Sequence, residues 1–550
     1  MRLVIVGGVA GGASAAARAR RLSEAAEIVL FERGPDASFA NCGLPYYLGG
    51  EIPDRGKLLV TSPAVLKDRY NLDLRTNTEV VKIDRAARSV TARRAADGST
   101  YDLSYDALIL APGAEPIRPP IPGIDLPNVF TLRNLPDVDR IKAAMDRGAG
   151  RATLIGGGFI GLELAENFIR RGIETTLVEL QDQVLPPLDR EMSTPLAAAV
   201  RGRGVRLLLG DSAEAIRATG DGLAIGLRSG VSIGADMVVV GVGVRPENAL
   251  AKAAGLEIGE RGGIRVDDRM RTSDPSIFAV GDAVEVRDFP SGAPAQVPLA
   301  GPANRQGRIA ADNVFGLDSR YRGTQGTAIV GFFEHVAAIT GASEKALRKQ
   351  GRSHQKVYIH ANQHAGYYPG ARPMTLKLLF EAPSGKILGA QAVGQEGVDN
   401  RINALAMAIQ AGLTVFDLEE SELAYAPQFG SAKDPVNMAG FVASNVLRGL
   451  VRQVHAEDLG AGDLAVASIV DVRTPKEYAA GRIEGAANIP LEELRGRLDE
   501  IPRDRPVVVH CQVGMRGYMA ARVLRDHGID AANLAGGYKT YRMHHPDAKL

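Results

Sequence analysis

The 550-residue chain has no tryptophan and only two cysteines, Cys42 and Cys511. A single pair so far apart excludes the disulfide-stapled scaffold of a small secreted protein. The formal net charge is +1, so no global field draws the chain to nucleic acid or to an anionic membrane. No apolar run reaches the roughly 20 residues of a membrane span, and the strand-like residues 3–6 leave no room for a signal peptide. We therefore expect a cytoplasmic protein with no nucleic-acid or membrane partner.

The composition is that of a multidomain globular protein. The chain is too long for one hydrophobic core, and its length predicts roughly three or four domains. Apolar residues make up 45% and charged residues 23% of the sequence, both ordinary values for a globular protein. The 63 glycines suit several glycine-rich turns of the kind that bind nucleotides.

A glycine turn lies between a predicted strand and a predicted helix near the start of the chain. Residues 3–6 are strand-like, residues 7–12 read GGVAGG, and a second strand ends just before Glu32. A tight glycine turn lets the backbone approach a pyrophosphate, which the free N–H groups of the following helix then bind. Glu32 is placed to accept hydrogen bonds from ribose hydroxyls. Val9 replaces the middle glycine of the usual motif, which weakens this copy when it is taken alone.

The same pattern returns at residues 152–179 in a complete form. Gly156, Gly158 and Gly161 follow a strand and precede a helix, and the next strand ends in Glu179. Two such copies predict two α/β nucleotide-binding domains. The Glu179 carboxylate favours NADH over NADPH, because it would bond a free 2′-hydroxyl and repel a 2′-phosphate. The neighbouring pair of arginines at 170–171 leaves the strictness of this preference open.

Two dinucleotide sites in tandem indicate an electron relay between a hydride donor and a flavin. Residues 272–283, TSDPSIFAVGDA, resemble the second flavin motif of the two-dinucleotide-domain flavoprotein disulfide reductases. Residues 110–113, LAPG, resemble the crossover motif of the same family. The resemblance implies that Asp282 bonds the ribitol chain of FAD.

Cys42 has no resolving partner nearby, since Tyr47 stands where a dithiol relative carries its second cysteine. The oxidised form of the enzyme must then be a mixed disulfide or a sulfenic acid. Residues 38–46, SFANCGLPY, resemble the active-site segment of the coenzyme A disulfide reductases, a likeness that covers roughly residues 1–445. In that family the single cysteine exchanges with coenzyme A (CoA) thiol.

The resemblance also implies CoA-contacting residues and a homodimer. Arg18 and Arg21, three apart on one helix face, suit phosphates, although a solvated helix face has the same appearance. Tyr367 and Tyr425 match two tyrosines that approach the cysteine from the partner subunit, where a phenol can donate a proton to a leaving thiolate. The implied CoA contacts are Ser14, Arg18, Arg21, Ser38, Asn41, Asn304 and Lys433.

Two alternatives to a CoA-dependent reductase remain. The first is the single-cysteine NADH oxidase and peroxidase branch, which cycles through sulfenic acid. Its peroxidase carries a histidine in the first glycine turn, where this chain has Ala10, and this difference argues against peroxide chemistry. The second is a redox or sulfur sensor that signals through Cys42. Two well-formed nucleotide sites favour turnover over sensing.

The C-terminal part resembles the rhodanese family at residues 471–475, DVRTP, and at residues 477–486. Residues 507–510 form a predicted strand that runs into Cys511, and a helix begins a few residues later. Converging backbone N–H groups and a helix N-terminus would stabilise a persulfide anion on this thiol, and Arg516 adds positive charge. Cys511 is the expected sulfur carrier. For Asp471 and Arg473, a buried structural ion pair and a catalytic role are equally open.

The predicted fold is α/β, with two Rossmann-like dinucleotide-binding domains, an α+β dimerisation domain and a C-terminal rhodanese domain. The expected ranges are 1–113 with 245–326 for FAD, 114–244 for NAD, 327–445 for dimerisation, 446–463 for a linker and 464–550 for rhodanese. The expected activity is NADH- and FAD-dependent reduction of CoA persulfide, polysulfide or CoA disulfide. The candidate catalytic residues are Cys42, Cys511, Tyr367, Tyr425 and Arg516, and no metal ligand is named. The candidate cofactor-binding residues are Gly7, Gly12, Glu32, Arg33, Asp282, Ala300, Gly156, Gly158, Gly161, Glu179 and Gly243.

Overall fold

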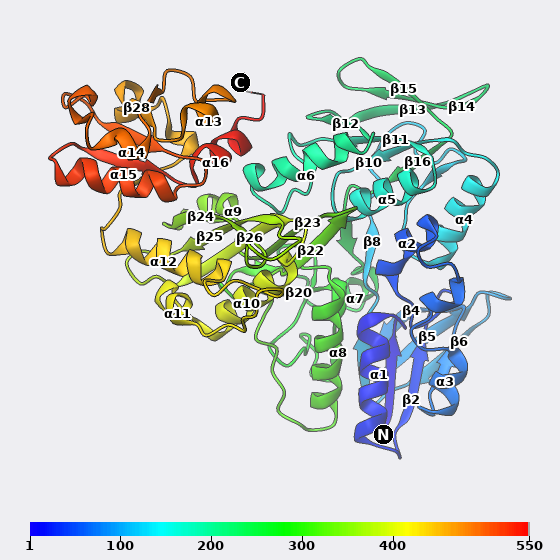
Figure 1. Ribbon diagram of the computed structural model, residues 1–550. Coiled ribbons are helices and arrows are strands. Elements are labelled where there is room, and N and C mark those ends of the chain that lie inside the picture. Colours follow the sequence, from blue (N-terminus) through cyan, green and yellow to red (C-terminus); the bar gives the residue numbers. More distant parts are fainter. Residues whose placement is uncertain (548–550) are drawn as a thin grey trace. The chain divides into compact units, whose positions relative to one another are not determined.

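The computed structural model describes residues 1–547 and divides into two compact units (Figure 1). The first unit contains residues 1–182 and 204–325, and the second contains residues 183–203 and the chain from residue 326 onward. Residues 548–550 of the predicted rhodanese domain lie outside the described residues. Among the described helices, none has the length and apolarity to cross a membrane.

The first α/β domain of unit one contains a parallel sheet of strand order β19-β7-β1-β2-β3. Helix α1 (Ala10–Leu22) packs along α8 (Ala300–Val314), so segments far apart in sequence lie side by side (Figure 1). The two helices approach so closely that a Cβ on Gly307 would lie only 2.2 Å from the Gly11 carbonyl oxygen. The strands are β1 (Arg2–Val6), β2 (Glu27–Phe31), β3 (Asp73–Arg75), β7 (Ala107–Leu110) and β19 (Ile277–Ala279), with an antiparallel sheet of β4 (Thr78–Asp84), β5 (Ser89–Arg94) and β6 (Thr100–Ser104) beside them.

The second α/β domain repeats this plan. Its parallel sheet has the order β12-β11-β10-β16-β9, and α5 (Phe159–Arg170) follows the glycine turn after β10. Strands β8 (Ala114–Pro116) and β17 (Val244–Pro246) pair where the chain crosses between the two domains. The remaining elements are α2 (Leu44–Gly49), α4 (Leu135–Asp146), β9 (Val129–Phe130), β10 (Arg151–Ile155), β11 (Glu174–Glu179), β12 (Arg206–Leu209), β13 (Ala213–Thr219), β14 (Gly222–Leu227), β15 (Ser232–Ala235) and β16 (Met237–Val240).

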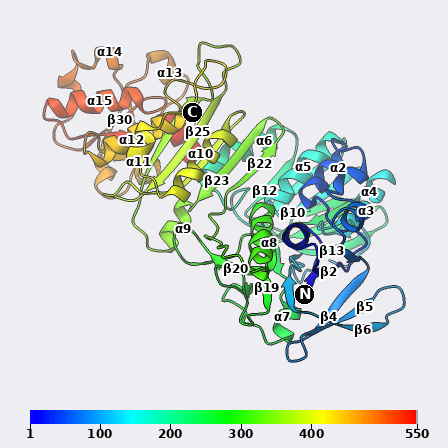
Figure 2. The same cartoon turned by 90° about the horizontal axis from the view of Figure 1, so that it is seen from below.

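The second unit is built on an antiparallel sheet of order β22-β23-β26-β25-β24. Helices α10 (Val398–Ala411) and α12 (Pro435–Leu447) cover one face, and α6 (Arg190–Gly202) lies against the other (Figures 1 and 2). Although α6 follows β11 in sequence, it belongs to this unit. The strands are β22 (Ala328–Phe332), β23 (His335–Gly341), β24 (Gln355–Asn362), β25 (Pro373–Phe380) and β26 (Ile387–Gly394). Helix α9 (Glu344–Lys349) lies between β23 and β24 in the chain, and α11 (Val415–Glu420) lies between α10 and α12.

The C-terminal domain has a parallel sheet of order β27-β31-β30-β28-β29. Part of the predicted linker 446–463 is not a linker, because β27 (Gln453–Val454) pairs with β31 at the edge of this sheet. β27 has only two residues, one of them the polar Gln453, so composition gave no sign of a strand there. The other elements are β28 (Ser468–Asp471), β29 (Ala487–Asn488), β30 (Val507–His510), β31 (Ala531–Leu534), α13 (Pro475–Ala479), α14 (Leu491–Leu494), α15 (Met515–Asp526) and α16 (Gly537–His544).

Candidate functional site

The first glycine turn is anchored by Glu32. One of its carboxylate oxygens accepts from the N–H of Gly8 at 2.9 Å, and the other accepts from the N–H of Gly34 at 2.8 Å. Gly7 has a φ of +101°, and a Cβ on Gly12 would lie 1.8 Å from the Gly7 carbonyl oxygen. A larger residue at either position would therefore push the turn and α1 apart.

The second turn has the same construction. The Glu179 carboxylate accepts from the N–H of Gly157 at 2.6 Å and from that of Gln181 at 2.8 Å. A Cβ on Gly161 would lie 2.0 Å from the Gly156 carbonyl oxygen, whereas a Cβ on Gly158 would point into open space. The open space at Gly158 leaves room for a pyrophosphate to approach the start of α5. Gly243, with a φ of +120°, follows β16 in the same sheet.

The residues expected to hold FAD fit that group. The Asp282 carboxylate has no hydrogen-bond or ion-pair partner among residues 1–547, and burial raises its pKa although Arg133 opposes the shift. A polar hydroxyl chain would supply the missing partners. Ala300 is the first residue of α8 and so offers a free backbone N–H. Arg33 is paired with Glu247 through both carboxylate oxygens, so its charge is already matched within the chain.

Cys42 lies in a short 3-10 turn, Asn41–Gly43, immediately before α2. Its side chain reaches solvent, yet partial burial raises the pKa of the thiol, and the negative charges of Glu163 and Asp282 raise it further. No cation counts among the causes of this shift. The surroundings of Cys42 therefore disfavour the thiolate relative to the thiol.

Glu163 was not found from the sequence. It lies in α5, and the Tyr46 hydroxyl donates to its carboxylate at 3.3 Å. Burial raises the pKa of Glu163 to about 7, although the bond from Tyr46 opposes the shift. The available signal was an acid two residues after the last glycine of a dinucleotide turn, in the mainly apolar first half of its helix. The structure thus places a group that titrates near neutrality between the second dinucleotide turn and the Cys42 segment.

Most of the predicted CoA contacts lie in unit one, and two of them bond each other. The Ser14 hydroxyl donates to the Asn304 side chain at 2.6 Å across the α1–α8 contact, and Asn41 donates to the Arg133 carbonyl at 2.9 Å. Ser38 is buried, with a φ of +53°. The two arginines of α1 differ, because the Arg18 guanidinium is paired with Asp312, whereas Arg21 is exposed. Lys433 is exposed too, and it lies in unit two.

The two predicted interface tyrosines meet in unit two. The hydroxyl groups of Tyr367 and Tyr425 are 2.8 Å apart, and both side chains are exposed. The hydrogen bond between the two hydroxyl groups raises the pKa of Tyr367. Phe429 and Met407 are also exposed in this unit, and large exposed apolar groups of this kind mark contact surfaces.

Cys511 lies at the carboxyl end of β30 with only 1% of its surface exposed. Its sulfur accepts from the N–H of Gly514 at 3.2 Å, and the Arg516 guanidinium also bonds it. A Cβ on Gly537 would lie 2.4 Å from the Cys511 carbonyl oxygen, so α16 presses against the loop. The thiol therefore lies at the base of a loop lined by backbone N–H groups.

The buried ion pair expected as one role of Asp471 and Arg473 is confirmed. Neither side chain reaches solvent, and the charged atoms approach to 2.7 Å. Arg473 also donates to the Gly481 carbonyl at 2.6 Å and to the Gln512 side chain at 3.1 Å. The pair thus fixes the position of the Cys511 loop as well as the fold.

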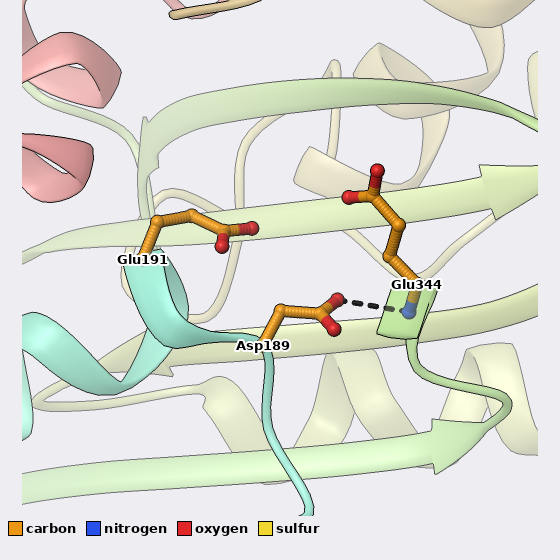
Figure 3. A group of neighbouring side chains, drawn as sticks. All are labelled: Asp189, Glu191 and Glu344. Atoms are coloured by element: carbon orange, nitrogen blue, oxygen red, sulfur yellow. Dashed lines mark hydrogen bonds between the residues drawn. The ribbon is translucent and has the colours of Figure 1, made fainter. Parts of the chain in front are cut away.

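One cluster of acids has the geometry of a cation site. Oxygen atoms of Asp189, Glu191 and Glu344 lie within 4.8 Å of one another (Figure 3). The Lys377 ammonium bonds all three, at 2.8, 2.5 and 2.6 Å. Lys377 is shared by all three acids and Lys356 bonds Glu344 as well, at 2.8 Å, so the cluster is part of a buried ion network.

Residues 1–307 match the family model described as pyridine nucleotide-disulphide oxidoreductase. This chain belongs to that family. Residues 327–435 match its dimerisation domain, and residues 453–544 match the rhodanese-like domain. The predicted fold class is confirmed, and FAD and NAD(H) are the cofactors of the family. The predicted identity as a coenzyme A disulfide reductase joined to a rhodanese domain is also confirmed.

Two solved structures match nearly the whole chain. One is the reduced CoADR-RHD of Bacillus anthracis, 49% identical, with a TM-score of 0.97 over 99% of this chain and 98% of that chain. The other is a NAD-dependent persulfide reductase from A. fulgidus, 38% identical, with a TM-score of 0.92 over 98% of this chain and 100% of that chain. The coenzyme A disulfide reductase of Staphylococcus haemolyticus is 34% identical over 81% of this chain and 100% of its own length.

Proposed function

We propose that this enzyme uses NADH and FAD to reduce CoA persulfide, polysulfide and CoA disulfide at Cys42, and that its rhodanese domain supplies sulfane sulfur through Cys511. The observation that carries the proposal is one chain with two acid-anchored dinucleotide turns, a solvent-reaching thiol without a resolving cysteine, and a second thiol in an amide-lined loop. The names of the similar coenzyme A disulfide reductase and persulfide reductase support the same chemistry.

The reaction balances with one hydride equivalent. The Cys42 thiolate attacks CoA–S–SH, a Cys42–S–S–CoA bond forms, and hydrosulfide leaves. When bound, FAD would supply the two electrons of NADH that cleave this disulfide, which returns Cys42 to the thiolate and releases CoA–SH with one proton. The thiolate that attacks in the next cycle is the one that cleavage of this disulfide leaves on Cys42. CoA disulfide follows the same steps, with a CoA thiol in place of hydrosulfide.

The residues that we assign to CoA are those of the α1–α8 contact and the Cys42 segment. Ser14 and Asn304 already face each other there, and Arg21 is exposed on the same helix as Arg18. We assign Arg18 and Arg21 to the phosphates, with Ser38, Asn41 and Lys433 completing the CoA site. Since Arg18 is paired with Asp312, its contribution requires that pair to be shared with the phosphate.

We assign the paired tyrosines to proton donation in a homodimer formed through the dimerisation domain. The hydrogen bond between Tyr367 and Tyr425 holds two exposed phenols in one place, and in the proposed dimer they act on Cys42 of the partner subunit. We assign NADH preference to Glu179, which its two backbone bonds fix in position. A cytoplasmic location stays a prediction and is consistent with the two free thiols.

The test is anaerobic NADH oxidation by the purified flavoprotein with CoA persulfide, CoA disulfide and hydrogen peroxide offered separately. We expect the highest kcat/KM with the persulfide, one hydrosulfide released per NADH, and no NADH-linked reaction in Cys42→Ser. A preference for peroxide would replace this proposal with a sulfenic-acid oxidase or peroxidase. Failure to turn over any of the three substrates would favour a sensor.

A second variant tests the division of labour between the two cysteines. Cys511→Ser should leave direct reduction of CoA persulfide within about twofold of the parent enzyme and remove NADH oxidation driven by an external sulfane donor plus CoA. Loss of the direct reaction in Cys511→Ser would show that Cys511 takes part in the reductase chemistry itself.

A further inference from the structure

The Arg516 guanidinium, which interacts with the Cys511 side chain, is already paired with an acid. Arg516 donates to both carboxylate oxygens of Glu477, at 2.9 and 2.6 Å. Glu477 is also fixed from the other side, where the N–H and hydroxyl of Thr474 donate to it at 2.9 Å in a capping box. Its hydrogen bond from Arg516 lowers the pKa of Glu477 to about 2, so the acid carries its charge throughout the neutral range.

The second cation that reaches the loop is matched as well. Arg473 is held by Asp471 and donates to Gln512, the neutral residue that follows Cys511. Lys539 contacts the loop through its backbone N–H, which donates to the Gln512 carbonyl at 3.0 Å. Its ammonium lies near His360, whose pKa it lowers in addition to the effect of burial. The Cys511 loop thus has a backbone N–H donor at the sulfur, and the two arginines that reach it are each paired with an acid.

The surroundings of the loop are apolar where they meet solvent. Val513 and Met515 in the loop and Met519 one turn further along α15 are exposed. Cys511 lies beneath them with 1% of its surface exposed. A sulfur donor therefore contacts apolar side chains before it reaches a thiol whose neighbouring arginines are already paired with acids.

We propose that Glu477 is a specificity-determining residue of the rhodanese domain: by neutralising Arg516 it selects organic persulfide donors over dianionic inorganic donors such as thiosulfate. This proposal rests on the part of the proposed function in which Cys511 accepts sulfane sulfur. It adds the chemical class of the donor.

The charges that meet at Cys511 differ between the two donor classes. With a persulfide, Cys511–S⁻ attacks the terminal sulfur of R–S–S⁻, a Cys511–S–S⁻ bond forms, and R–S⁻ leaves with the bonding electron pair. With thiosulfate the same bond forms, but the leaving group is sulfite, a dianion. One more negative charge must then be accommodated beside the sulfur, and the Glu477 carboxylate opposes it at short range.

The experiment compares donors at one site in the full-length holoenzyme. Glu477→Gln removes the charge and retains an amide oxygen for the capping box, which accepts Gln as well as Glu. Glu493→Gln is the matched control, because Glu493 is an acid of the same domain paired with Arg497 at 2.8 Å. Sulfur transfer to cyanide is measured as thiocyanate, with thiosulfate and with glutathione persulfide as donors.

We expect the parent enzyme and Glu493→Gln to prefer the persulfide. In Glu477→Gln, kcat/KM for thiosulfate should rise by about tenfold, the scale of one hydrogen bond to a charged group, and that for the persulfide should change by less than about twofold. The gain with thiosulfate should shrink as salt is added. A purely structural role for Glu477 would lower both rates together and would not produce a salt-dependent change in their ratio.

A second pair of variants introduces charge without touching the capping box. Val513→Lys places an ammonium at the exposed rim and should raise thiosulfate transfer selectively, whereas Val513→Gln should not. A parent enzyme that uses thiosulfate as well as persulfide, or an unchanged donor ratio in both Glu477→Gln and Val513→Lys, would overturn the proposal. NADH oxidation with CoA persulfide at Cys42 reports on the proposed function separately and should be unaffected by all of these variants.

Discussion

Replacing Lys377 by methionine should destabilise the packing of α6 and α9 against the antiparallel sheet of the second unit. Lys377 is 0% exposed and lies in β25 on the face opposite α10 and α12. Its ammonium bonds Asp189, Glu191 and Glu344, which come from the start of α6 and from α9 (Figure 3). Methionine fills a similar volume but removes the ammonium that Asp189 and Glu191 share, whereas Glu344 keeps its ion pair with Lys356 at 2.8 Å.

The expected loss follows from the cost of an unpaired buried charge. Removing one partner of a buried ion pair typically costs about 3–5 kcal/mol, and about 1.4 kcal/mol corresponds to a tenfold change in an equilibrium constant. Opening of this face should therefore become about 10²- to 10³-fold more frequent. Lys142→Met is the control, because Lys142 forms an exposed pair with Asp146 at 3.1 Å and such pairs contribute about 0–1 kcal/mol.

Amide hydrogen exchange on the full-length holoenzyme measures this opening by segment. We expect faster exchange in β25, in the neighbouring β24 and in α16 of Lys377→Met, with β1 and β2 of the first unit unchanged. Lys142→Met should resemble the parent enzyme throughout. If exchange in β24, β25 and α16 of Lys377→Met stays within tenfold of the parent, Lys377 does not stabilise this face and the electrostatic reasoning is wrong.

Three further outcomes can be measured separately. Burial raises the pKa of Glu163 to about 7, so Glu163→Gln should remove an ionisation near pH 7 from the kcat/KM profile of CoA persulfide reduction, which Glu51→Gln should retain. Burial lowers the pKa of His360 to about 3, so the unfolded chain binds more protons than the folded chain below pH 6.5. The free energy of unfolding should therefore fall with decreasing pH by up to about 1.4 kcal/mol per pH unit, and urea unfolding of His360→Gln should depend less steeply on pH. Glu179→Gln should raise the NADPH-to-NADH ratio of kcat/KM by roughly tenfold, and an unchanged ratio would remove Glu179 from cofactor selection.

The parts of the enzyme that the sequence predicted are those whose geometry is local. A strand, a glycine turn, a helix and a second strand ending in an acid lie within about 30 residues, and the acid bonds back to its own turn. That is the case for Glu32 with Gly8 and for Glu179 with Gly157. The loop of Cys511 is equally local. Each of these sites could therefore be named from residue spacing.

The polar face of the second unit could not be predicted in this way. In β24, Lys356, Tyr358 and His360 alternate with apolar residues, a pattern that normally indicates a solvent-facing side. Instead, Lys356 bonds Glu457, Tyr358 donates to Glu191 at 3.0 Å, and His360 bonds Thr540 at 2.8 Å. These partners lie more than 100 residues away in the chain, so alternation reveals the polar face but not what covers it.

The surroundings of the two thiols assign them opposite roles in the passage of sulfur. A persulfide anion on Cys511 is stabilised by the Gly514 N–H and by Arg516. At Cys42 the neighbouring charges are those of Glu163 and Asp282, and they disfavour an anion. In the proposed cycle, sulfur therefore rests on Cys511, whereas hydrosulfide is expelled at Cys42. Because a cation stabilises both the attacking Cys42 thiolate and the departing hydrosulfide, Glu163→Lys should speed hydrosulfide release without changing thiocyanate formation at Cys511, and equal effects on both reactions would contradict this division.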